Sequence, residues 1–169
     1  MARLDPEGMV RRLFKLLPKF STGEINYASS RVAVVVTVFV KHKEKILLVK
    51  RSNKVSGYRG KWNAVSGYVD QIRPIGEIAL KEIQEEVGIK GANVLRISAG
   101  KVYSFSDKNE GKRWIVCPYI VETKRQPKIK LDWENTSYKW IIPEEIAKFE
   151  IVPNLDKSLA SSLKTLRPE

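Results

Sequence analysis

Three glutamates near the middle of the chain, Glu82, Glu85 and Glu86, have the types and spacing best suited to chemistry. On a helix with about 100° between residues they fall at about 0°, −60° and +40°, so they share one face. Like charges on one face repel one another, and a hard divalent cation with oxygen ligands relieves that repulsion. The spacing therefore predicts a metal site. For the Glu-x-x-Glu-Glu pattern without its flanks, a solvated acidic face is the alternative.

The helix that carries these glutamates is predicted over residues 74–87. Pro74 suits its first turn and Gly88 suits its end. Its apolar positions lie beside the acidic face and are expected to contact the core. Glu77 and Lys81 fall on the far side, four residues apart, where we expect an exposed ion pair.

The residues around the glutamates resemble the Nudix box. In that family a glycine is followed after five residues by glutamate, and seven residues later by Arg-Glu-aliphatic-x-Glu-Glu-x-Gly-aliphatic. Here Gly67 matches the first glycine, and residues 82–89 match the end of the box without a gap. The resemblance covers roughly residues 31–166. It implies an α/β fold, a Nudix-type α/β/α sandwich with a mixed β-sheet.

Two positions depart from the family pattern. Arg73 stands where the family has its first glutamate, and Lys81 stands where it has arginine. The resemblance implies that these two residues brace the segment before the helix, and Arg73 with Lys81 cannot form that ion pair. Asp70 or Glu77 is the expected substitute partner. Metal affinity and rate are the properties that this departure affects, because groups that orient metal ligands influence both.

The resemblance also implies a reaction: attack by water on a phosphorus of a nucleoside diphosphate linked to another moiety. It implies Mg²⁺ or Mn²⁺ as the cofactor, held by the catalytic residues Glu82, Glu85 and Glu86. One of these carboxylates is a candidate for the general base. Glu134, in the loop six residues before Trp140, is the second candidate, with an exposed loop acid as the alternative.

Three residues are expected to bind the nucleotide substrate. Arg51, at the end of a predicted strand, is the candidate for the phosphates, with Lys50 and Lys54 as competitors. Tyr68 is a candidate for stacking on a base. Tyr103 lies in a region where some family members carry a residue specific to their substrate class. A tyrosine there favours dinucleoside polyphosphates over ADP-ribose.

Hydrophobic periodicity predicts the elements that position these residues. His42 falls in the expected turn of the first hairpin and is expected to be exposed. Strands are expected at residues 32–40, 45–51, 62–68, 93–105, 113–123 and 137–142, and helices at residues 74–87, 143–147 and 155–166.

Residues 1–30 differ from the remainder, residues 31–169, which form the expected domain. Apolar and basic residues alternate in a short amphipathic helix that is expected to end near Pro18, and a linker follows. Such a helix packs on its own domain or on a second subunit of a homodimer. Contact with a membrane surface or an acidic partner is the alternative.

Composition bounds the location and the partners. The net charge of +12 attracts nucleotides, nucleic acid or anionic lipid, while solubility or adaptation to heat is the alternative reason for it. The longest apolar stretch, residues 32–40, is too short to span a bilayer, so no membrane span is expected. A lone cysteine, Cys117, and the absence of a secretion signal favour the cytoplasm.

Three functions remain open from the sequence. The first is a metal-dependent pyrophosphohydrolase acting on a nucleoside triphosphate or a dinucleoside polyphosphate. The second is a non-catalytic module that senses a nucleotide, and the third is an RNA 5′-end-processing enzyme, for which the basic charge is suited. The intact set of Glu82, Glu85 and Glu86 favours the first.

Overall fold

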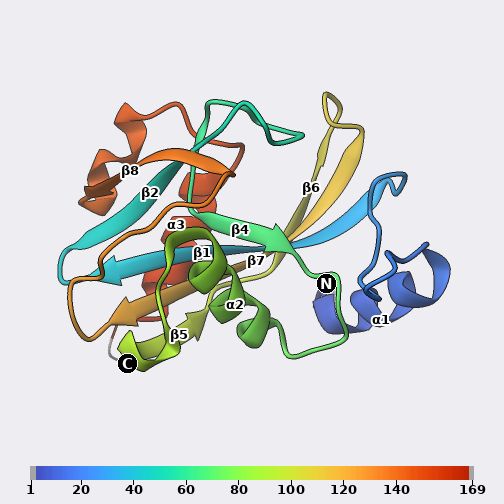
Figure 1. Ribbon diagram of the computed structural model, residues 1–169, viewed down its shortest axis with the longest axis horizontal. Helices are drawn as coiled ribbons and strands as arrows, with labels where there is room; N and C mark the ends of the chain where they lie inside the picture. Colours follow the sequence, from blue (N-terminus) through green and yellow to red (C-terminus); the bar gives the residue numbers. More distant parts are fainter. Residues whose placement is uncertain (1–2, 168–169) are drawn as a thin grey trace.

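The computed structural model describes residues 3–167 as a central sheet with helices on both sides (Figure 1). The helices are α1 (Pro6–Leu16), α2 (Ile75–Val87) and α3 (Leu155–Lys164), with two short 3₁₀ helices, η1 (Gly91–Asn93) and η2 (Pro143–Lys148). The strands are β1 (Val32–His42), β2 (Lys45–Arg51), β3 (Trp62–Asn63), β4 (Val65–Tyr68), β5 (Val94–Ala99), β6 (Tyr103–Asp107), β7 (Lys112–Thr123) and β8 (Asn135–Ile141).

The sheet is mixed, as expected. Its main path runs β3-β2-β1-β7-β5, and β4, β6 and β8 pair with β1, β7 and β2, respectively. The central pair, β1 with β7, is parallel, from Val32 opposite Arg113 to Lys41 opposite Glu122. The other strand pairings described are antiparallel.

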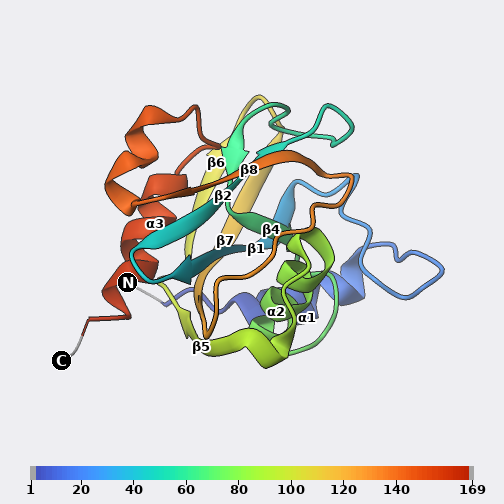
Figure 2. The same ribbon diagram turned by 60° about the vertical axis from the view of Figure 1, so that its left-hand side comes forward.

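Two apolar clusters cover the two faces of this sheet. Val36 and Val38 of β1 contact the cluster that includes α1 and α2, whereas Phe39 contacts the cluster that includes α3. Figure 2 shows α3 on one side of the sheet and α1 with α2 on the other. A central strand covered on both faces is apolar at nearly every position, which explains the continuous run at residues 32–40. The expected α/β/α sandwich is therefore confirmed.

Two predicted strands are each divided in two. The strand expected at residues 62–68 breaks at Ala64, so that β3 pairs with β2 while β4 pairs with β1. The strand expected at residues 93–105 breaks near Gly100, so that β5 and β6 pair with different halves of β7. Between those halves lies Pro118, whose backbone has no N–H to donate, and its carbonyl accepts from Gly100 N at 2.8 Å. The helix predicted at residues 143–147 is a 3₁₀ helix.

The N-terminal helix packs on the sheet domain. Asp5 caps it by accepting a hydrogen bond from Gly8 N at 2.9 Å. Val10 and Leu13 are buried in the same cluster as α2. Of the helices in the described residues, none combines the length and the apolar character that crossing a membrane requires.

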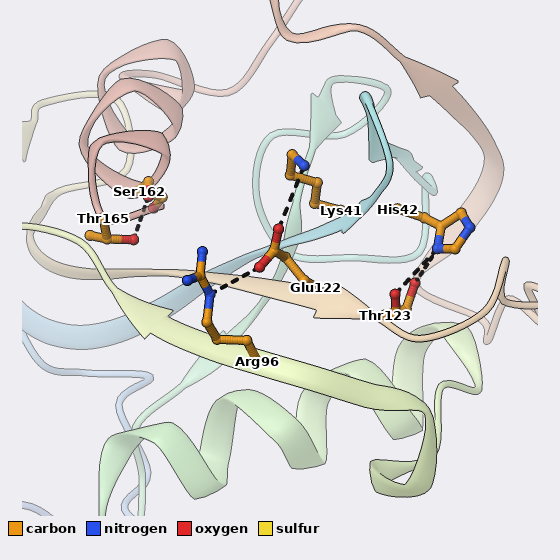
Figure 3. Close-up of polar contacts among 7 residues, drawn as sticks. All are labelled: Lys41, His42, Arg96, Glu122, Thr123, Ser162 and Thr165. Carbon is orange, nitrogen blue, oxygen red and sulfur yellow. Dashed lines mark hydrogen bonds and ion pairs between the residues drawn. The ribbon is translucent and has the colours of Figure 1, made fainter. Parts of the chain in front are cut away.

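Polar pairs connect the strands at one end of the sheet (Figure 3). Glu122 of β7 lies between Lys41 Nζ, at 3.6 Å, and Arg96 Nε, at 2.9 Å, because both neighbouring strands bring a cation opposite it. His42 belongs to β1, where it is half-buried with its Nδ1 3.0 Å from Thr123 Oγ1. The expectation that His42 is exposed is therefore wrong, because the turn begins one residue later.

Candidate functional site

The catalytic candidates lie on the second half of α2, which begins and ends as its sequence predicts. Pro74 precedes the first turn, and Gly88 ends the helix in the left-handed conformation with φ of 76°. Along this half, Glu82 is half-buried, Glu85 is exposed and Glu86 is 3% exposed. The three carboxylates of the acidic face therefore differ in solvent exposure, which decreases from Glu85 to Glu82 to Glu86.

Gly67 makes room for Glu82. A Cβ atom placed on Gly67 would lie 2.3 Å from Glu82 Cδ, a distance that no side chain tolerates. The glycine lies on β4, against which α2 packs. Any other residue at this position would displace the carboxylate that the helix presents beside the strand.

Glu86 is held by hydrogen bonds to both of its oxygens. Ser66 N donates to one oxygen at 3.0 Å, and Asn135 Nδ2 donates to the other at 3.1 Å. A buried carboxylate without partners would be strongly destabilising, so these donors compensate part of its burial. They also fix the direction of the carboxylate.

A second pair of acids reaches Glu86 from the loop before β8. Glu86, Asp132 and Glu134 each offer an oxygen, and these atoms lie within 4.8 Å of one another. The loop is held by Asp132 N, which donates to the Glu86 carbonyl at 3.1 Å, and by Ser52 N, which donates to the Glu134 carbonyl at 2.8 Å. This cluster shares Glu86 with the helical set expected from the sequence and adds Asp132 to it.

Crowding and burial favour the protonated forms of these acids. The pKa of Glu82 is raised to about 8, first by burial and then by the charges of Glu85 and Glu134. The pKa of Glu86 is raised well above its usual range by burial and by the neighbouring Glu134, with which it shares a hydrogen bond. Burial is also the main reason why the pKa of Glu134 is raised. An oxygen-rich, desolvated cluster with these properties suits a hard divalent cation.

Three of these acids line a cleft of about 730 Å³. The lining includes Glu82, Glu85 and Glu134, together with the three predicted substrate-binding residues Arg51, Tyr68 and Tyr103. Lys50 and Lys54, the competitors of Arg51, are not among the lining residues. Lys50 Nζ lies instead 6.0 Å from the centre of the Trp62 ring.

Arg51 is oriented by its own loop. Its Nε donates to the Gly57 carbonyl at 2.9 Å, which turns the guanidinium into the cleft that Gly57 also lines. Its charge acts on Glu134, lowering the pKa of that acid against the effect of burial. The cation of Arg51 therefore lines the cleft near enough to Glu134 to act on its charge.

Aromatic rings line the same cleft. Tyr68 stacks with Tyr27, at 5.0 Å between ring centres, and with Trp114, at 6.2 Å. Tyr103 stacks on Phe105 at 6.3 Å. All five rings line the cleft. Such rings can accommodate a planar apolar group such as a nucleobase.

Tyr103 has its hydroxyl engaged by the protein. The oxygen lies 2.7 Å from Ser158 Oγ and 3.3 Å from the Asn154 carbonyl, to which it donates. Burial raises the pKa of this hydroxyl. The ring is therefore the part of Tyr103 that faces the cleft.

Arg73 and Lys81, the two departures from the family pattern, each form an ion pair in the structure. Glu77 forms its ion pair with Arg73, at 3.2 Å, and Lys81 pairs with Glu85, at 3.7 Å. The expected Glu77–Lys81 pair is thus wrong, because each cation pairs with the acid four residues after it, and Lys81 therefore reaches Glu85 in place of Glu77. Glu77 is the substitute partner of Arg73 that the sequence suggested.

Sequence reasoning missed several residues around the acids. Asp132 and Asn135 lie close to Glu134 in the sequence. This group of polar residues before a predicted strand could have indicated that they belong to the site. Ser66 acts through its backbone N–H, for which the sequence contains no signal. Phe20 and Tyr27 precede the expected domain, yet both line the cleft.

Comparisons with known proteins show the family and agree with the fold. The family model described as NUDIX domain matches residues 29–161. No curated protein matches the sequence. Similar solved structures include a MutT NUDIX hydrolase from Burkholderia pseudomallei, with 19% identity and a TM-score of 0.64 over 78% of this chain and 98% of that one.

Two further solved structures are similar in fold. An Ap4A hydrolase from C. elegans, in a binary complex, has 18% identity and a TM-score of 0.64 over 79% of this chain and 97% of that one. The NUDIX domain of Shewanella oneidensis NrtR, in complex with ADP ribose, has 16% identity and a TM-score of 0.64 over 80% of this chain and 88% of that one. At these identities the likeness concerns the fold.

Proposed function

Because the chain belongs to the Nudix family, we propose that it is a metal-dependent hydrolase of a diphosphate linkage in a nucleoside diphosphate derivative. One observation carries the proposal: carboxylates that include Glu82, Glu85 and Glu134 line the same cleft as a set of aromatic rings, and Glu134 belongs to a cluster of acids able to hold a metal ion. A nucleotide offers a partner to each, because its anionic phosphates can bind the acids through a cation and its planar base can contact the rings.

We assign Glu82, Glu85 and Glu86 as the residues that hold Mg²⁺ or Mn²⁺. Asp132 and Glu134 lie close enough to Glu86 to join them. When bound, the metal neutralises the phosphates, polarises a phosphoryl oxygen and activates a water. The hydrogen bonds from Ser66 and Asn135 keep Glu86 in one orientation, which a ligand with fixed geometry requires.

Glu134 is our candidate for the general base. It lines the cleft, and its backbone N–H donates to Asp132 Oδ1 at 3.0 Å, which restrains its loop. From there its carboxylate can accept a proton from a water that attacks phosphorus. Arg51, beside it, holds the remaining phosphate oxygens by charge-assisted hydrogen bonds.

Tyr68 and Tyr103 are assigned to contact the base. Both line the cleft as members of groups of stacked rings, and aromatic contacts tolerate different bases. The proposed substrate is a nucleoside triphosphate or a dinucleoside polyphosphate. The names of similar structures, a MutT hydrolase and an Ap4A hydrolase, support these two classes.

A sensor is the second candidate, and one observation favours it. Arg73 and Lys81 form ion pairs along their own helix surface, so the bracing pair of the family is missing. A protein that binds a nucleotide without cleaving it does not require that brace. RNA 5′-end processing rests on the net charge of +12 and stays a prediction, as do a homodimer and a cytoplasmic location.

A nucleotide panel separates the hydrolase from the sensor. We expect purified protein with Mg²⁺ or Mn²⁺ to release inorganic phosphate or pyrophosphate, or to form nucleoside monophosphate, from at least one nucleoside triphosphate or dinucleoside polyphosphate. Glu82→Gln is the matched variant, because it removes the charge and keeps the shape. Binding of a nucleotide with no cleavage across the panel with either metal would establish the sensor instead.

A further inference from the structure

Residues 18–30, called the arm below, connect α1 to β1 and lie almost wholly before the NUDIX match, which begins at residue 29. The arm is nevertheless fixed to the segment that leads into α2. Ile25 N donates to the Asp70 carbonyl at 2.9 Å. The Tyr27 hydroxyl, which is buried, donates to the Val69 carbonyl at 2.6 Å.

Two side chains fix the arm further. Lys112 Nζ, at the start of β7, donates to the carbonyls of Tyr27 at 2.8 Å and Ser30 at 2.7 Å. Gln71 Nε2 donates to Glu24 Oε1 at 3.2 Å. The arm is therefore connected both to the sheet and to the segment before the acidic helix.

This anchored arm forms part of the wall of the cleft, which it lines with Phe20, Tyr27 and three residues between and beyond them. The loop between β2 and β3 and the loop before β8 supply further lining residues. Figure 2 shows all three segments on the right-hand side of the molecule. The arm therefore contributes part of the cleft's lining from outside the matched domain.

Phe20 is held at the tip of the arm by a tight turn. Phe20 N donates to the Glu24 carbonyl, and Gly23 N donates to the Phe20 carbonyl, both at 2.9 Å. Gly23 has φ of 99°, a conformation that L-residues with side chains rarely adopt. The turn leaves the ring 54% exposed while it lines the cleft.

Exposed aromatic rings are concentrated at this cleft. Among residues 3–167, the exposed aromatic side chains are Phe20, Tyr68, Trp133 and Tyr138, and the first three line the cleft. Phe20 has no polar group that water could solvate, so its exposure favours a ligand that covers the ring.

We propose that the arm is part of the substrate site and that Phe20 stacks on the base of the bound nucleotide. The inference rests on the proposed function, because the acids that line the cleft define where the diphosphate lies. It adds a substrate-binding residue that lies before the matched family domain. A nucleobase is the planar group of such a ligand, and aromatic stacking on a base is largely independent of its identity.

The test compares ligands with and without a base. Isothermal titration with Mg²⁺ measures binding of the four common ribonucleoside diphosphates and of inorganic pyrophosphate. We expect Phe20→Ala to weaken the tightest nucleotide about fivefold or more, the lower end of base–aromatic stacking. Pyrophosphate affinity should not change, and Phe20→Trp should keep the nucleotide affinity. The melting temperature should also be unchanged, since the ring is half out of contact with the protein.

Leu16→Ala is the matched control, because Leu16 is 72% exposed on α1 and does not line the cleft. Equal nucleotide affinity in Phe20→Ala and wild type would overturn the inference and leave the proposed hydrolase intact. So would a loss of self-association in Phe20→Ala without a change in nucleotide affinity, which would assign the ring to a contact between copies. A wild type that binds nucleotide through Phe20 but cleaves none would overturn the hydrolase alone. Wild type that binds none of the nucleotides would overturn both.

Discussion

The acids and the aromatic rings at the cleft are held in place by opposite means. Glu82, Glu86 and Glu134 are crowded although their charges repel, and the pKa of each is raised. Tyr68 stacks with two other rings, and such contacts stabilise the folded chain by themselves. The proposed function requires a cation to complete the acids, whereas the rings need no added group.

If the protein is the proposed hydrolase, this difference predicts which residues determine the rate and which determine the affinity. Groups that act on the phosphorus change the rate, because they are needed in the transition state. Groups that stack on a base change affinity in the ground state and the transition state alike, so they alter KM more than kcat. The boundary between the two effects should lie near Arg51, which lies beside Glu134 in the cleft.

The largest expected effect tests this division directly. Glu82→Gln should lower kcat about a hundredfold or more, because a metal ligand and its charge are lost. Nucleotide affinity measured without metal should change little. Tyr68→Ala should do the reverse, raising KM about fivefold or more with a smaller change in kcat. Steady-state kinetics with the substrate found in the panel measures both, and equal kcat losses in the two variants would contradict the division.

Metal bound at Glu82, Glu85 and Glu86 should stabilise the folded protein. At a concentration about a hundred times its Kd, Mg²⁺ or Mn²⁺ should add about 2.7 kcal/mol to the free energy of unfolding, visible as a higher melting temperature. The triple variant Glu82→Gln, Glu85→Gln, Glu86→Gln should lose most of this increase. An equal increase in wild type and triple variant would mean that the metal binds elsewhere.

The pH dependence of the metal-free protein should show the same crowding. The pKa of Glu82 is about 8 in the folded chain against an ordinary value of 4.5, so the folded state binds more protons between these values. Stability from this group is therefore fully present below about pH 4.5 and is lost as pH rises through about 8. One proton contributes a slope of at most about 1.4 kcal/mol per pH unit.

Chemical unfolding in a chelator between about pH 5 and pH 8.5 measures that slope. We expect Glu82→Gln to reduce this slope, since Glu86 and Glu134 still contribute to it, while a Glu77→Gln control on the opposite side of the helix keeps it. A wild-type protein that gains stability with rising pH over this range would reverse the sign and refute the assignment.

The smallest expected effect concerns the missing brace. Arg73→Glu with Lys81→Arg restores the family residues and removes the exposed pair with Glu77. If the missing brace limits how well the acids of α2 hold the metal, metal affinity or kcat should rise severalfold in this double variant. KM for the nucleotide should be unchanged. The single change Arg73→Ala is the control, since it breaks the present pair without forming a new one. No gain would show that the hydrogen bonds from the arm to Val69 and Asp70 already hold this segment.

The sequence was sufficient for the parts of the fold that depend on local pattern. The helix with Gly88 at its end, the first hairpin and the layered class all follow from periodicity and turn residues. The breaks within two strands were not predictable, because they depend on which partner strand each half meets. Pro118 shows this, since its effect falls on Gly100, far along the chain but adjacent in the sheet.

The candidate site divides in the same way. Glu82, Glu85 and Glu86 share one helix and could be placed together from their spacing. Asp132 and Asn135 reach Glu86 only through the path of a loop, and Phe20 reaches the cleft only because the arm folds back. Patterns along one element carry information about neighbours on that element, whereas contacts between elements require the tertiary structure.

The parallel pairing of β1 with β7 has a consequence for how the protein forms. Val32 pairs with Arg113, so the central strands of the sheet come from segments that are distant in the chain. Contacts of this kind close late, because a long loop must be ordered before the pairing stabilises it. During synthesis β1 leaves the ribosome long before its central partner does, with a strand that is apolar on both faces. The hairpin with β2 and the cover from α1 can form in that interval, so the earliest part of the chain shields its own core strand.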